Sequence, residues 1–271
     1  IRQSQKLEAI GQLAAGIAHE INTPTQYIGD NTRFLKDAFT DFLELLEKVE
    51  ELVNKAKAGE DLTDSISAIE VTKDTIDLDY LVEEIPLAID QSLEGIGRVA
   101  KIVSAMKEFS HPGEDEKTMT DINQALESTI TVARNEWKYV SDMETDLSPT
   151  MPMVPCLPGD INQVFLNLIT NAAHAIGTAL GDRPTTKGKI TISTAAKDGF
   201  AEIRISDTGT GIPGEIQNRI FDPFFTTKEV GKGTGQGLSI AYNVVVEKHG
   251  GKLSFETEPD QGTTFIIELP L

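Results

Sequence analysis

The chain is 271 residues long, which exceeds the usual size of one domain, roughly 100 to 200 residues, and predicts two domains. Hydrophobic residues make up 39% of the chain and charged residues 25%, a balance that excludes a disordered chain and fits a protein with a buried core. The formal net charge of -19 produces a field that repels phosphate backbones and anionic lipid, so it argues against nucleic acid and membrane surfaces as partners.

No apolar run reaches the ~20 residues that a membrane-spanning helix needs, so we expect no membrane contact within this segment. The one cysteine, Cys156, cannot form an internal disulfide, which fits a reducing compartment. We therefore expect a cytoplasmic location. The chain opens at Ile1 inside a helical pattern, and we interpret it as a fragment of a longer protein whose upstream sensory part is missing and could include a membrane anchor.

Apolar residues recur at steps of three and four from Leu7 to Ala56, which predicts one very long amphipathic helix with a kink at Pro24. Gly59 breaks this pattern, so we expect a turn over residues 58–64, with Thr63 or Asp64 capping the helix that follows.

A second apolar stripe runs from Leu78 to Met106, contains Pro86, where we expect another kink, and stops at Pro112-Gly113. Two long antiparallel helices cannot cover their apolar stripes by themselves. The economical solution is an all-α helical hairpin, over residues 1–113, that forms a four-helix bundle as a homodimer.

The residue pattern changes after the acidic linker GEDEKT, residues 113–118. Periodicity predicts helices over residues 121–137, 160–177 and 236–249, and alternation predicts strands over 189–194, 202–206, 252–257 and 263–269. The first two strands flank a turn at Lys197-Asp198-Gly199. The pattern is that of an α+β two-layer sandwich over residues 118–271.

One polar residue stands out in the first helix. His19 lies off the apolar stripe, so it should point outward, and Glu20 follows it off the same stripe. The segment LAAGIAHEINTP, residues 13–24, resembles the histidine box of sensor histidine kinases. That resemblance implies that His19 is the phospho-acceptor and Glu20 its base. By the same resemblance, Thr23, four residues after the histidine, positions a water that removes the phosphate from a partner's phosphorylated aspartate.

Two amides share one face of the helix predicted over residues 160–177. Asn167 and Asn171 are four residues apart, and their oxygens suit a hard cation such as Mg²⁺. The segment resembles the asparagine box of the Bergerat-type ATP-binding fold shared by histidine kinases, gyrase and Hsp90 chaperones, which implies that Asn171 ligates Mg²⁺. ATPases of this superfamily carry a glutamate base where this chain has Asn167, and His174 replaces a frequent lysine near the phosphates.

Glycine-rich motifs follow in the family's order. DTGTGIP, residues 207–213, resembles the first glycine box, FDPFF the phenylalanine box, GKGTGQG the second glycine box, and GTTF, residues 262–265, the last. By this resemblance Asp207 reads the adenine amine, and glycines at a helix start cradle phosphates. The residues implied to contact the nucleotide are Asn167, Asn171, His174, Asp207, Gly209, Gly211, Ile212, Lys228, Gly233, Gly235, Gly237, Leu238 and Thr263. Phe224 and Phe225 would hold down a lid between Pro213 and Gln236.

The ordered motifs imply a histidine kinase that uses ATP and Mg²⁺ to phosphorylate His19 and then relays phosphate to the receiver domain of a response regulator. A nucleotide-gated ATPase clamp of the gyrase or Hsp90 type is the alternative, and Asn167 argues against it because a carboxamide cannot act as a general base. A dimeric scaffold with a decayed ATP site is a third reading.

Overall fold

The computed structural model describes residues 2–110, 116–181, 186–227 and 235–271. The chain forms two compact units, one of His19–Ala100 and one of Ile1–Ala18 with Lys101–Leu271. Among the described residues, no helix is both long and apolar enough to cross a membrane. The predicted domain bounds, 1–113 and 118–271, stay a prediction.

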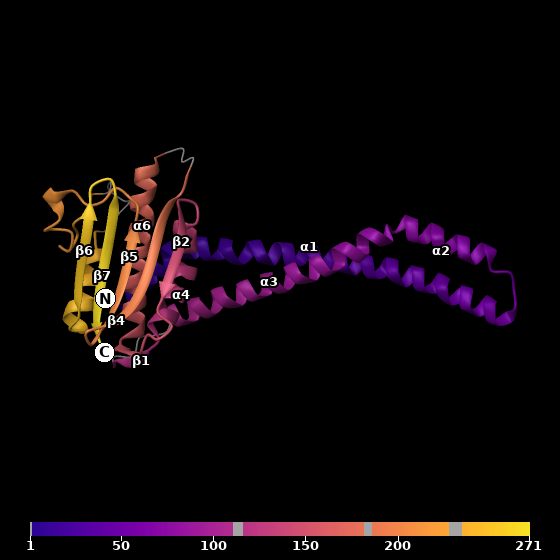
Figure 1. The fold of residues 1–271 in the computed structure, drawn as a ribbon, viewed down its shortest axis with the longest axis horizontal. Helices are drawn as coiled ribbons and strands as arrows, with labels where there is room; N and C mark the ends of the chain where they lie inside the picture. Colours follow the sequence, from indigo (N-terminus) through magenta and orange to yellow (C-terminus); the bar gives the residue numbers. More distant parts are fainter. Residues whose placement is uncertain (1, 111–115, 182–185, 228–234) are drawn as a thin grey trace. The chain divides into compact units, whose positions relative to one another are not determined.

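Three helices make up the hairpin, namely α1 Arg2–Ala58, α2 Thr63–Thr75 and α3 Leu78–Ser110 (Figure 1). The predicted turn is confirmed, since Gly59 has a φ of 74° after the end of α1. The expected cap is wrong, because Leu62 occupies the capping position and the Asp61 carboxylate accepts hydrogen bonds from the Thr63 amide at 3.1 Å and hydroxyl at 2.8 Å. A break before α3, where Asp77 has a φ of 49°, was not predicted. Both α1 and α3 continue through their prolines.

Antiparallel packing within His19–Ala100 follows one seam. The Phe34 and Tyr80 rings meet edge to face at 6.3 Å, and the Asn31 amide donates a hydrogen bond of 3.2 Å to the Ala88 carbonyl. At Gly95 a β-carbon would lie 2.7 Å from Cε2 of the Tyr27 ring, so the two helices approach closely there because this residue has no side chain. The seam therefore fixes the register of α3 against α1.

The α+β part has a five-stranded sheet in the order β2-β4-β5-β7-β6, parallel between β2 and β4 and antiparallel elsewhere. Its strands are β2 Ser141–Leu147, β4 Gly188–Lys197, β5 Phe200–Asp207, β6 Lys252–Glu258 and β7 Gly262–Pro270. A separate antiparallel pair joins β1 Thr118–Thr120 to β3 Val154–Cys156. The four predicted strands are confirmed, whereas β1, β2 and β3 were not predicted.

Helices cover one face of this sheet (Figure 1). The helical segments of this part are α4 Ile122–Val132, α5 Arg134–Trp137, α6 Pro158–Leu180, η1 Gly214–Ile216, α7 Gly237–Tyr242 and η2 Asn243–Lys248. The long helix α6 packs against β4, β5 and β7. Its Phe165, Leu168 and Ile169 are fully buried, as are the inward isoleucines of β4, β5 and β7. The predicted α+β sandwich is confirmed, and Asp121 starts α4 by accepting a hydrogen bond of 3.1 Å from the Gln124 amide.

A buried histidine that the sequence did not single out ties two helices together. His249 accepts a hydrogen bond of 2.9 Å at Nε2 from the Leu157 amide, at the start of α6. Its Nδ1 therefore carries the hydrogen and donates to the Val244 carbonyl at 2.7 Å. Burial lowers the pKa of His249, which keeps the ring neutral and suited to this pair of contacts.

Candidate functional site

The carboxyl of Asp207 is the main buried charge at the end of the sheet. Along β5 the side chains of Ala201, Ile203, Ile205 and Asp207 alternate into the core, so Asp207 is 8% exposed. Its Oδ1 accepts a hydrogen bond of 2.8 Å from the Gly209 amide, and the backbone of Thr263, its partner on β7, provides a second. Burial nevertheless raises the pKa of Asp207 to about 6. Such a carboxylate gains from a ligand that offers it one more hydrogen-bond donor.

Glycines let the backbone close tightly around this carboxyl. A β-carbon at Gly262, where φ is 116°, would lie 1.9 Å from the Asp207 carbonyl oxygen. At Gly211, where φ is 66°, it would lie 2.3 Å from the carbonyl oxygen of Glu258, and at Gly209 it would meet the Ala175 backbone at 2.6 Å. Only glycine fits such contacts. Gly262 was part of a recognised motif but was not assigned a role.

A hydroxyl that sequence reasoning missed holds the neighbouring loop. The Thr257 oxygen accepts a hydrogen bond of 2.9 Å from the amide of Ile212, which was a predicted site residue. The same hydroxyl donates to the Gly262 carbonyl at 3.1 Å and lies 3.0 Å from the Thr263 hydroxyl. Thr257 lies in a predicted strand but in no motif, and the pairing of β6 with β7 brings it to this place.

Three predicted polar residues share one face of α6. The Asn167 amide donates a hydrogen bond of 3.1 Å to the Gly237 carbonyl, which ties α6 to the start of α7. Asn171 is half-buried one turn later. His174 is exposed, with its Nε2 at 3.8 Å from a Glu136 carboxylate oxygen on α5. The Asn171 side chain carries an amide oxygen, a ligand of the hard kind that Mg²⁺ prefers.

The segment predicted to form a lid is only partly described. Gly235 has a φ of 65°, and a β-carbon there would lie 2.5 Å from the Phe224 backbone, so this predicted glycine is sterically required. Leu238 is half-buried in the first turn of α7. Phe224 is 72% exposed, so its predicted role as an anchor is wrong in this structure. Two further predicted contacts, Lys228 and Gly233, lie outside the described residues.

His19 is exposed on α1, as predicted, but its neighbour is not. Glu20 is 5% exposed, and its Oε2 lies 2.5 Å from Nη2 of Arg98 on α3. The prediction that Glu20 points outward is wrong because α3 supplies an opposite charge that makes burial affordable. Thr23 is exposed, and its hydroxyl donates a hydrogen bond of 3.0 Å to the His19 carbonyl.

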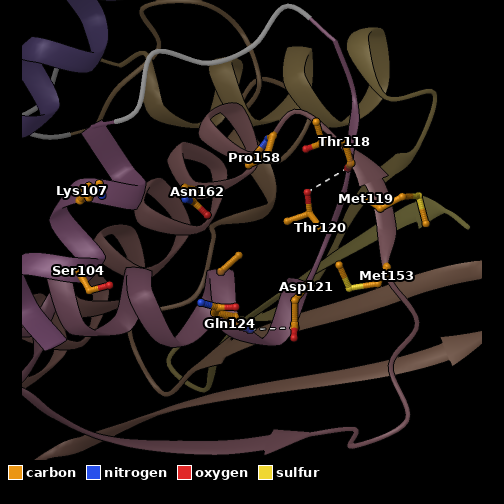
Figure 2. A pocket seen from close by; sticks show the side chains of 11 residues that line it. Ser104, Lys107, Thr118, Met119, Thr120, Asp121, Gln124, Met153, Pro158 and Asn162 are labelled. Atoms are coloured by element: carbon orange, nitrogen blue, oxygen red, sulfur yellow. Dashed lines mark hydrogen bonds between the residues drawn. The ribbon is translucent and has the colours of Figure 1, made fainter.

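A separate cavity of about 580 Å³ shares no residue with the predicted nucleotide set. Figure 2 shows its lining, which includes Asp121 and Gln124 at the first turn of α4 and Asn162 on α6. The Asn162 side-chain oxygen is buried and has no hydrogen-bond partner among the described residues. The cavity therefore offers one buried acceptor but no cluster of charged groups.

Comparisons with known proteins agree on one family. Residues 157–271 match the model described as histidine kinase-, DNA gyrase B-, and HSP90-like ATPase. The signal transduction histidine-protein kinase AtoS of Escherichia coli (strain K12) is 27% identical over 99% of this chain and 36% of that protein. Sporulation kinase C of Bacillus subtilis (strain 168) is 30% identical over 100% of this chain and 51% of that protein. The chain thus spans about a quarter to a half of the length of the curated relatives it matches.

Among solved structures, the catalytic domain of histidine kinase ThkA is 30% identical, with a TM-score of 0.49, over 57% of this chain and 97% of that one. The relatives match the whole length of the chain, and the family model matches residues 157–271. Over its whole length the chain is similar to sensor histidine kinases, and its C-terminal part matches the ATP-binding domain type shared with DNA gyrase B and HSP90.

Proposed function

We propose that this chain is an ATP-dependent protein histidine kinase that phosphorylates His19. One combination carries the proposal: an exposed imidazole next to a buried carboxylate on one helix, and the buried Asp207 carboxyl in the α+β fold of the same chain. The exposed ring of His19 is accessible to a phosphoryl donor, and the Asp207 carboxylate can accept a hydrogen bond from the exocyclic amine of adenine.

Transfer of the γ-phosphoryl group from ATP to His19 needs a nucleophile and a base, and His19 and Glu20 supply them. The ring nitrogen of neutral His19 that carries no hydrogen attacks the γ-phosphorus of ATP. A nitrogen–phosphorus bond forms, and the bond to the bridging oxygen breaks, so that ADP leaves with the electron pair. The hydrogen on the other ring nitrogen passes to the Glu20 carboxylate, which acts as general base. Positioning and charge neutralisation supply most of the rate increase in such transfers.

Asn171 would hold Mg²⁺ together with phosphate oxygens, and the bound ion would neutralise charge on the triphosphate. Backbone N–H groups at the start of α7, near Gly235 and Gly237, suit the phosphates, because a helix N-terminus favours anions. His174 and Lys228 are the candidate side chains for further phosphate contact.

A water-hydrolysing ATPase clamp is disfavoured by Asn167. Its side chain has no basic group, and its amide donates to the Gly237 carbonyl. Steady release of phosphate without labelled protein would support the clamp. A scaffold with a decayed site would fail to bind ADP in calorimetry.

We further propose that phosphate passes from His19 to an aspartate in the receiver domain of a response regulator. Both His19 and Thr23 are exposed, so a partner domain can approach this part of α1. The Thr23 hydroxyl retains acceptor capacity besides its bond to the His19 carbonyl, which suits a water that attacks an aspartyl phosphate. Thr23→Ala is expected to reduce dephosphorylation of a phosphorylated response regulator while leaving His19 labelling intact.

The chain is proposed to work as a homodimer, with a phosphotransfer domain over residues 1–113 and an ATP-binding domain over 118–271. Support for the dimer comes from apolar side chains that α3 leaves exposed, such as Leu93 at 63% and Ile96 at 54%. A cytoplasmic location for this segment follows from its proposed substrate, ATP.

Labelling with γ-³²P-ATP tests the central proposal. We expect label that is stable in alkali and lost in acid, as a phosphoramidate requires, and no label in His19→Ala or in Asn171→Asp. ADP binding measured by calorimetry should survive in His19→Ala, because that variant leaves the α+β fold unchanged. Acid-stable label, or undiminished label in His19→Ala, would contradict phosphorylation at this histidine.

A further inference from the structure

A short ion pair in the hairpin joins the proposed base to the opposite helix. Glu20 Oε2 and Arg98 Nη2 are 2.5 Å apart, and the Glu20 side chain is 6% exposed while that of Arg98 is 36% exposed. Burying a carboxylate is costly unless an opposite charge and hydrogen bonds compensate it. The sequence places Glu20 beside His19, but only the packing of α3 against α1 brings Arg98 to it.

Adjacent residues on a helix point about 100° apart, so a glutamate does not face the preceding histidine by default. To take a proton from the His19 ring, the Glu20 carboxylate must be held in one of several rotamers. A guanidinium bonded to one carboxylate oxygen restricts those rotamers and keeps the group ionised, which a proton acceptor must be.

We propose that Arg98 is a positioning residue for phosphorylation of His19, holding the Glu20 carboxylate charged and oriented from the other helix of the hairpin. The inference rests on the proposed kinase function and names a residue to which no motif pointed. Arg98 acts through Glu20 and is not itself expected to contact the phosphoryl group.

The contact is also tied to the register of the two helices. One turn before Arg98, Gly95 packs against Tyr27, and further along the same seam Asn31 donates to the Ala88 carbonyl. Because these contacts leave little room for sliding, the position of Arg98 relative to Glu20 reports how α3 lies against α1. A shift of α3 along its axis would move the guanidinium away from the carboxylate and lower the rate at His19.

The test compares Arg98→Ala and Arg98→Lys with the matched control Arg33→Ala, whose guanidinium pairs with Asp30 on the surface of the same unit. Initial rates of His19 labelling are measured against ATP concentration and pH, together with the thermal unfolding midpoint. For Arg98→Ala we expect kcat to fall at least tenfold with KM for ATP changed less than twofold. Without the guanidinium the acid form of Glu20 is favoured, so the acidic limb of the pH–rate profile moves to higher pH.

Arg98→Lys keeps the charge but not the planar fork, so it should recover part of the rate and most of the wild-type pH profile. The exchange variant Glu20→Arg with Arg98→Glu separates positioning from stability. It retains an ion pair across the seam and should regain the thermal midpoint, yet it leaves no base beside His19 and should stay inactive. Arg33→Ala should match the wild type.

A wild-type rate and pH profile in Arg98→Ala, or activity restored by the exchange variant, would overturn the role of Arg98 while leaving the kinase proposal intact. A wild-type chain that binds ADP but never labels His19 would overturn the proposed function, and with it this inference. The two failures are therefore distinguishable in one set of measurements.

Discussion

The carboxyl of Asp207 titrates in a range where nucleotide binding can be measured. Burial raises its pKa from 3.8 to about 6, so the free site is largely protonated below that pH and ionised above it. The adenine amine donates a hydrogen, which the ionised form accepts at either oxygen. A proton therefore competes with the ligand, and we expect the Kd for ADP to be constant above pH 7 and to rise towards tenfold per pH unit below about 6.

Calorimetry with ADP between pH 5 and 8 measures this dependence. The control is Asp207→Asn, which has similar size but no titrating group, and we expect its ADP affinity to be weak and flat over the same range. An affinity in the unaltered chain that does not change between pH 5 and 7 would show that the Asp207 carboxylate is not the acceptor.

Gly262 tests the close backbone approach beside the same carboxyl. Gly262→Ala places a β-carbon 1.9 Å from the Asp207 carbonyl oxygen, whereas Gly199→Ala, also at positive φ (82°), meets nothing within 4 Å. Positive φ alone costs an alanine roughly 1–2 kcal/mol. We expect the control variant to lose about that much stability and to bind ADP normally, and Gly262→Ala to lose more stability and most ADP binding. Thermal unfolding and calorimetry check both, and equal behaviour of the two variants would refute the steric argument.

These residue-scale features differ in how far the sequence could predict them. Asp207 and Thr263 were expected together, and the strands pair them directly, since both lie in motifs with an ordered spacing. Thr257 and Arg98 were not expected. Each acts through a partner far away in the chain, Ile212 for Thr257 and Glu20 for Arg98, and periodicity carries no information about such partners. The orientation of Glu20 was wrong for the same reason.

At the scale of elements, alternation and helical periodicity located most of the fold. These two signals did not detect strands in which buried and exposed side chains do not alternate. The edge strand β2, with the sequence SDMETDL, exposes or half-exposes six of its seven residues, so its side chains show no apolar alternation. The strands β1 and β3 have three residues each, too few to display a period. The helix predicted over residues 236–249 exists, but it widens into the π-helical η2 after Tyr242.

The close packing of α3 against α1 at Gly95 predicts how the stability of the hairpin responds to a larger side chain there. In Gly95→Ala the new methyl group would press on the Tyr27 ring at 2.7 Å and on the Ile28 side chain at 3.0 Å. Overpacking of this kind usually costs about 1–3 kcal/mol. We therefore expect the hairpin to unfold at lower urea concentration, as followed by far-UV circular dichroism, and His19 labelling to fall because the seam also sets the Arg98 contact.

Gly97→Ala is the matched control, because it lies on the same helix with nothing within 4 Å of the new methyl. Alanine is favoured over glycine in a helix by up to about 1 kcal/mol, so this variant should be slightly more stable than the unaltered chain. The double variant Gly95→Ala with Tyr27→Leu removes the ring and should regain part of the lost stability. If the two alanine variants stabilise the hairpin equally, the close packing at Gly95 has no energetic role.

At the scale of the whole molecule, α3 carries two apolar stripes but a single chain covers only one. Leu81, Ala88 and Ile102 are buried. One residue further round the helix, a second stripe is exposed at steps of three, four and seven residues, and it consists of Val82, Ile89, Leu93, Ile96 and Val103. Such spacing is typical of a seam between helices, so the exposed stripe is suited to the same stripe of a second copy.

Two lysines in this stripe should separate the copies. Burying one large aliphatic side chain contributes roughly 1.5–3 kcal/mol, and a two-fold dimer loses each site twice, so Leu93→Lys with Ile96→Lys removes about 6–12 kcal/mol of association free energy. The chain has a net charge of -19, so added lysines do not raise the overall repulsion between copies. Within the seam, burying unpaired ammonium groups adds to the cost of the lost apolar contact. Sedimentation velocity should show a monomer for this variant and a dimer for Met119→Lys, which alters an exposed apolar residue of β1. A dimer that persists in the double variant would place the interface elsewhere.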